Sequence, residues 1–184
     1  DTVKPVDADI DGSTLAEAVQ EHRATSPDFR RSMEVTFRDD PIPGLGVTID
    51  DFSMHELREE IERSGVAIYG WGSWNDACTA DTVVRRLMTF NNPQRAVIGA
   101  WNHGGDKNAD QYRPDYSPPA PSHLAQWLED LRFFDHHLKG VDTGVMDGKP
   151  LTYITMGEER WKRTAAWPAA PAGNRRWYMA AGGA

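Results

Sequence analysis

One stretch constrains the fold of this chain more than any other: two short apolar runs with a helical segment between them. The runs are VAIYG at 66–70 and RAVIGAW at 95–101. Between them, DTVVRRLMTF at 81–90 spaces its apolar side chains as a helix does, and NNP breaks it. A strand, a helix and a strand with short links predict two parallel strands under a right-handed crossover. The fold class is therefore expected to be α/β.

Helices are expected on the amino-terminal side of this unit. Thr14 and Glu17 have the spacing of a capping box, which predicts a first helix. Ser53 and Glu56 repeat that spacing ahead of a second helix that Gly65 should end. Pro41, Pro43, Gly44 and Gly46 break the segment after the first helix, so residues 1–52 are expected to form short helices and loops rather than a sheet.

A longer helix is expected after the polar, proline-rich loop at 106–121. Ser122 is suited to its N-cap and Gly140 to its C-terminal end. Its apolar residues recur at helical spacing, which indicates an amphipathic helix packed through one stripe. That stripe comprises Leu124, Trp127, Leu128, Leu131, Phe134 and Leu138.

The pattern after this helix favours β structure. LTYITM at 151–156 and RRWYMA at 175–180 are typical of strands, and a loop with WPAAPAG joins them. A boundary is therefore expected within 140–148. Two strands rarely stand alone, so we expect the chain to be part of a longer one.

Two polar residues follow the two predicted parallel strands. Asp76 comes shortly after the first strand, and His103 comes two residues after the second. The carboxyl ends of parallel strands meet at one edge, so these side chains should lie close together. An aspartate that accepts a hydrogen bond from a histidine ring leaves the other ring nitrogen free to take a proton from a nucleophile. The order Asp then His matches the last two members of an α/β-hydrolase triad.

The first member of such a triad is not evident. No serine of the chain lies in a G-x-S-x-G elbow, and Cys78 lacks the flanking glycines as well. We therefore expect the nucleophile upstream of these residues. The chain by itself should be inactive and should not react with a fluorophosphonate probe.

Simpler interpretations stand beside these roles. Asp76 could be a helix cap, and His103 could bond to a backbone turn. Three tryptophans, Trp71, Trp74 and Trp101, could be core or could line a substrate pocket next to the triad.

Metal binding is not expected. His136 and His137 are adjacent on a helix and so point about 100° apart. The loop with Asp106 and Asp110 lacks the glycine and the distal glutamate of a calcium loop.

Composition narrows the partners and the compartment. A net charge of −8 without a basic stripe argues against nucleic acid. The apolar runs are too short to span a membrane. One cysteine excludes an internal disulfide and favours a reducing compartment, hence the cytoplasm. Secretion stays open because we expect the true N-terminus to be missing.

Four segments carry a family resemblance: VAIYGWGSWNDACTADT, AVIGAWNHGG, FFDHHLKGVDTGV and ITMGEERWKRTAAWP. In this order they resemble the cocaine esterase and X-Pro dipeptidyl peptidase family of serine hydrolases. The resemblance covers about residues 66–168. It places the triad aspartate on Asp76 and the triad histidine on His103.

The resemblance also implies a domain plan. Residues 1–52 would be a segment of a helical cap, 53–143 the C-terminal half of an α/β-hydrolase domain, and 144–184 the start of a β jelly-roll. It implies cleavage of an ester or amide through an acyl-enzyme without a cofactor or metal. The substrate would be a small ester, an amide or a short peptide. Open sheet edges predict self-association or a companion fragment. The alternative is a non-catalytic binding module on a degenerate hydrolase scaffold.

Overall fold

A computed structural model describes residues 7–25, 31–114, 117–169 and 173–179. The chain divides into two compact units, Asp1–Leu57 and Arg58–Ala184, and each is described by itself. Within the described residues, every helix is too short or too polar to cross a lipid bilayer.

The first unit is built from short helices. They are η1 (Asp7–Asp9), α1 (Ser13–Ala24) and η2 (Asp50–Phe52). Helix α1 forms where it was predicted, but the predicted Thr14–Glu17 capping box does not form. The carboxylate of Asp9 instead accepts the backbone N–H groups of Thr14 and Leu15 at 2.7 and 2.9 Å. These bonds satisfy two of the free donors of the first turn and lower the pKa of Asp9.

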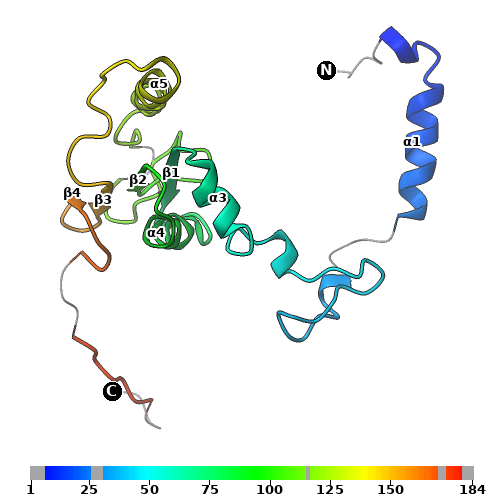
Figure 1. Ribbon diagram of the computed structural model, residues 1–184, viewed down its shortest axis with the longest axis horizontal. Helices are drawn as coiled ribbons and strands as arrows, with labels where there is room; N and C mark the ends of the chain where they lie inside the picture. The colour runs from blue at the N-terminus through cyan, green and yellow to red at the C-terminus, as the bar shows by residue number, and fades with distance from the viewer. Residues whose placement is uncertain (1–6, 26–30, 115–116, 170–172, 180–184) are drawn as a thin grey trace. The chain divides into compact units, whose positions relative to one another are not determined.

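The second unit holds one four-stranded sheet with the order β1-β2-β3-β4 (Figure 1). Strand β1 (Ile68–Ser73) runs parallel to β2 (Gln94–Gly99), and α4 (Thr79–Thr89) connects them. The predicted strand–helix–strand unit is therefore confirmed, with the first strand reaching three residues further than VAIYG. Strand β3 (Leu151–Thr155) is parallel to β2, and β4 (Arg160–Thr164) is antiparallel to β3.

The helix before β1 starts later than predicted. Helix α3 spans Arg58–Ser64, and a turn precedes it. The Ser53–Glu56 capping box does not form, because the Ser53 hydroxyl donates to the carbonyl of Ile49, four residues earlier. Gly65 has φ 65° and ends α3, as its position predicted.

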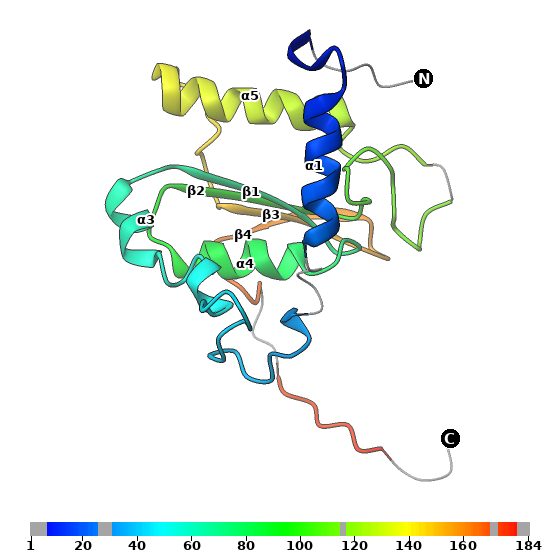
Figure 2. The same cartoon turned by 90° about the vertical axis from the view of Figure 1, so that its right-hand side faces the viewer.

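Helices α4 and α5 (His123–Lys139) cover opposite faces of the sheet (Figure 2). The sequence of β1 suits this arrangement, since Tyr69 and Trp71 contact α5 while Gly70 and Gly72 lie under α4. The absence of side chains at the two glycines lets α4 approach the strand closely. The buried core on the α4 side comprises Ala80, Val83, Val84, Ala96, Ile98 and Leu151.

Helix α5 has the predicted ends but not the predicted orientation. The Ser122 hydroxyl accepts the N–H of Ala125, and Gly140 closes the helix with φ 69°. Its buried residues are Gln126 and Phe133, while the apolar stripe expected to pack inside is exposed. Apart from Phe133, the side facing the sheet is polar: Glu129 and Asp130 accept hydrogen bonds from rings of β1, and Gln126 donates to the loop before the helix. The exposed stripe consists of Leu124, Trp127, Leu128, Leu131, Phe134 and Leu138.

The segment beyond α5 does not start a separate sheet. Strand β3 pairs with β2, so β3 and β4 extend the α/β sheet across the expected boundary at 140–148. The jelly-roll is therefore not confirmed. The predicted strand at 175–180 is wrong for its described residues, since 175–179 form no strand and are exposed; Ala180 lies outside the described residues. The structure bears out a mixed α/β unit; the helical cap stays a prediction.

Candidate functional site

Asp76 and His103 meet at the carboxyl edge of β1 and β2. The Nδ1 atom of His103 lies 3.0 Å from one carboxylate oxygen of Asp76 and 3.1 Å from the other. The Asp76 side chain is 16% exposed, whereas that of His103 is 90% exposed. The Asp76 carboxylate is thus largely shielded from solvent, whereas the His103 ring is exposed.

A buried serine joins the two strand ends that carry this pair. The Ser73 hydroxyl donates to the carbonyl of Trp101 at 2.6 Å. Its oxygen accepts the N–H groups of Trp101 and Asn75, both at 3.1 Å. Ser73 is nearly fully buried, so these bonds are shielded from water. Ser73 thus has a structural role at the strand ends, which the sequence did not predict because its partner Trp101 lies 28 residues away.

The turn that presents Asp76 is braced by the first residue of α4. The Thr79 hydroxyl donates to the Asp76 carbonyl at 2.8 Å and accepts the N–H of Ser73 at 3.1 Å. Ala77 has φ 38°, a conformation that residues other than glycine rarely adopt. Such strain persists only where the surroundings fix the backbone, and it clusters at functional sites.

The loop that carries His103 folds back on itself. Trp101 forms an isolated antiparallel bridge with Asn108, and the Ala109 N–H donates to the carbonyl of Ala100. Inside the loop, the Asn102 amide donates to Asp106 at 2.8 Å, which lowers the pKa of Asp106. Asp106, one of the two aspartates of the rejected calcium loop, thus shapes the loop around His103.

A carboxyl pair lies where this loop meets the β3–β4 turn. Asp110 is almost fully buried, and burial followed by the neighbouring Glu159 raises its pKa. Glu159 accepts from Arg113 at 2.6 Å, and this contact lowers the pKa of Glu159. One oxygen of Asp110 accepts the Tyr112 N–H, while the other is buried without a partner among the described residues. A proton held on Asp110 would satisfy that oxygen beside Glu159.

The three tryptophans considered for substrate binding have different surroundings. Trp71 donates to Asp130 at 2.7 Å and lines a cavity under α5. Trp74 donates to the Ile154 carbonyl at 2.8 Å and packs against Trp167. Trp101 is buried, and its ring covers Gly99. Their role in substrate binding stays a prediction.

One group in the first unit has the spacing of metal ligands. Ligand atoms of Asp50, His55 and Glu56 lie within 4.8 Å of one another. The Arg38 guanidinium donates to Asp50 and contacts the His55 ring, so the positive charge beside these groups is supplied by Arg38 itself.

In the second unit, the rings of His136 and His137 meet edge to face, and Nδ1 of His136 lies 3.2 Å from the Val141 carbonyl oxygen.

The Asp76–His103 arrangement has a defined chemical capacity. A carboxylate on Nδ1 fixes the tautomer that carries hydrogen there and stabilises the imidazolium that forms when Nε2 takes a proton. The exposed ring leaves Nε2 open to a nucleophile or to water. The pair is therefore equipped for general acid–base chemistry.

Comparison with known proteins gives two relatives, while no protein-family model matches the chain. One is from Mycobacterium bovis and the other from Mycobacterium tuberculosis, and both bear the name "Putative serine esterase". Each is 33% identical to this chain over 198 aligned residues, which take in 97% of the chain and 31% of the relative. The chain thus spans about a third of the length of the curated relatives it matches.

Proposed function

We propose that this chain supplies the aspartate and histidine of a serine esterase. The observation that carries the proposal is the contact of both Asp76 oxygens with Nδ1 of His103, at 3.0 and 3.1 Å. The similarity to two proteins named as serine esterases supports the same reaction class.

The proposed reaction proceeds through an acyl-enzyme. Nε2 of His103 takes the proton of a serine hydroxyl as the serine oxygen attacks the ester carbonyl. The imidazolium then gives that proton to the leaving alcohol, and a water repeats the sequence to release the acid. Asp76 keeps its charge throughout and orients the ring.

The serine is proposed to come from residues outside these 184. No serine of the chain has the G-x-S-x-G setting, and the relatives are about three times as long as the chain. Strand β1 is at the end of the sheet order, and the apolar stripe of α5 faces away from the described core. We propose that the segment with the serine packs against these two surfaces.

The substrate class is proposed to be carboxylic esters. The names of the relatives favour an ester over the X-Pro dipeptides that the family resemblance also allows. Assays with a p-nitrophenyl ester and with an X-Pro p-nitroanilide separate the two. Faster cleavage of the anilide would contradict the ester assignment.

An Asp76→Asn substitution in the protein as encoded tests the triad role. The amide keeps the shape of the carboxylate but not its charge, so kcat for the ester should fall on the order of 10^4-fold. Asp81→Asn is the matched control, because Asp81 lies five residues on, is exposed and pairs with Arg85. Equal activity of the two variants would contradict the triad role of Asp76. Absence of ester hydrolysis by the unaltered protein would instead favour a non-catalytic binding module.

A further inference from the structure

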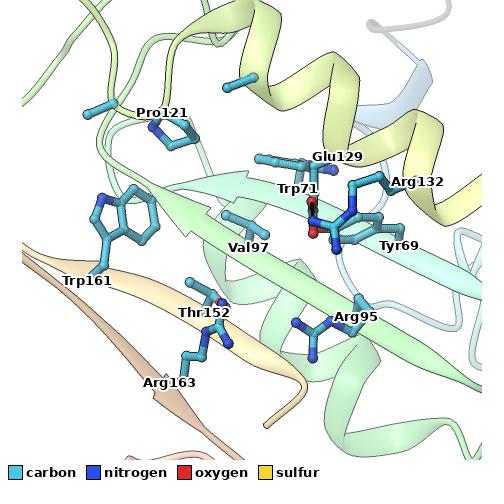
Figure 3. Close-up of a pocket in the computed structure, with 12 residues that line it drawn as sticks. Tyr69, Trp71, Arg95, Val97, Pro121, Glu129, Arg132, Thr152, Trp161 and Arg163 are labelled. Carbon is cyan, nitrogen blue, oxygen red and sulfur yellow. Dashed lines mark hydrogen bonds and ion pairs between the residues drawn. The ribbon is translucent and has the colours of Figure 1, made fainter. Parts of the chain in front are cut away.

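The second unit, Arg58–Ala184, also contains a cavity of about 630 Å³ between α5 and the sheet (Figure 3). Residues of β1, β2, β3, β4 and α5 line it. Neither Asp76 nor His103 is among them, so the cavity is separate from the proposed catalytic pair. Its volume lies within the range of pockets that hold small organic molecules.

Part of the cavity wall is aromatic. Tyr69, Trp71 and Trp161 line it, together with Val97 and Pro121. The polar atom of the Trp71 ring is already used by Asp130, and the Tyr69 hydroxyl donates to Glu129 at 3.3 Å. These rings therefore offer apolar surface for a flat ligand.

Three arginines line the same cavity, and only one of them is neutralised. Arg132 forms an ion pair with Glu129 at 2.7 Å. Arg95 is buried, and within the described part of the chain it donates only to the carbonyl oxygens of Asp147 and Lys149, at 3.1 and 2.9 Å. Arg163 has no hydrogen bond or ion pair with any described residue. In Figure 3 the Arg163 side chain ends beside Thr152, and the Arg95 side chain extends from β2 into the same part of the cavity.

Within this cavity, Arg95 and Arg163 lack the carboxylate partner that other arginines of this acidic chain have. Arg58, Arg85 and Arg113, for example, each pair with a carboxylate. Two guanidinium groups that line one partly enclosed space repel, and an anion between them would replace the repulsion by charge-assisted hydrogen bonds. The arrangement thus favours a negatively charged ligand.

We propose that this cavity binds an aromatic carboxylate, with its charged group between Arg95 and Arg163 and its ring against Trp71 and Trp161. The planar guanidinium fork matches the geometry of a carboxylate. The site goes beyond the proposed esterase activity and does not depend on it.

Titration with 2-naphthoate tests the proposal directly. Binding is followed by calorimetry and by quenching of tryptophan fluorescence, with 2-naphthylmethanol as the neutral ligand of the same ring system. The anion should bind at least 10-fold more tightly than the alcohol, since hydrogen bonds to charged groups are worth a factor of about 10 to 100. Equal affinities, or no binding of the anion at millimolar concentration, would overturn the proposal.

The Arg163→Gln variant tests whether the anion binds in this cavity. It is preferred to a change of Arg95, which also holds the backbone before β3. Arg163→Gln should weaken naphthoate binding about 10-fold or more and leave the alcohol unchanged. Arg160→Gln is the matched control: it lies on the same strand, is not among the residues that line the cavity, and has a partner in Glu158. Loss of naphthoate affinity in Arg160→Gln equal to that in Arg163→Gln would contradict the assignment.

Discussion

The close approach of α4 to β1 predicts that two glycines on the same face of one strand differ sharply in tolerance. A Cβ atom at Gly72 would lie 2.9 Å from the Thr79 carbonyl oxygen, about 0.5 Å inside the ordinary contact distance of 3.4 Å. The obstacle is backbone, so the first turn of α4 would have to move. At Gly70 the Cβ would lie 3.3 Å from a methyl group of Val83, a side chain that can yield.

We expect Gly72→Ala to be less stable than Gly70→Ala by about 1–3 kcal/mol, the usual cost of overpacking. Both substitutions reduce the entropy of the unfolded chain alike, so the difference between them isolates the native contact. Urea unfolding followed by tryptophan fluorescence measures it, provided that the m-values agree. Equal midpoints for the two variants, or a less stable Gly70→Ala, would refute the packing argument.

Two further predictions concern the supports of the site. Ser73→Ala leaves three backbone groups at the strand ends without their partner, so the free energy of unfolding should fall by about 1–3 kcal/mol; an unchanged urea midpoint would contradict this. The pKa of Asp110 is raised in the folded protein. At pH values between the ordinary carboxyl pKa of the unfolded chain and this raised pKa, the folded state therefore binds more protons than the unfolded state. Stability should therefore fall as the pH rises through the folded pKa, and Asp110→Asn should flatten this part of the pH profile. An identical profile in the variant would count against a proton held on Asp110.

The parts of the fold that could be predicted are those that local sequence determines. Apolar runs, helical spacing and a breaker at 91–93 are enough to predict β1, α4 and β2, because each signal lies within one element or its link. The crossover rule then places Asp76 and His103 at the same edge, where the structure joins them. Ser122 and Gly140 likewise act within one turn of the helix that they bound.

The parts that escaped prediction depend on partners far along the chain. The face that α5 turns to the sheet depends on hydrogen bonds from the rings of Tyr69 and Trp71, which lie 60 and 59 residues before their partners Glu129 and Asp130. The spacing of apolar residues along the helix does not indicate these bonds. The pairing of β3 with β2 links strands on either side of a long loop and helix, so the segment looked like the start of another domain. Ser73 contacts Trp101 across 28 residues, which no motif signals.

Fluorophosphonate labelling of the protein as encoded, mapped by mass spectrometry, tests the central claim most directly. The probe reacts with a serine only when a base such as His103 activates it. We predict one labelled serine outside these 184 residues, and loss of labelling in His103→Ala at unchanged stability. Labelling of a serine within this chain, or full labelling in His103→Ala, would contradict the account.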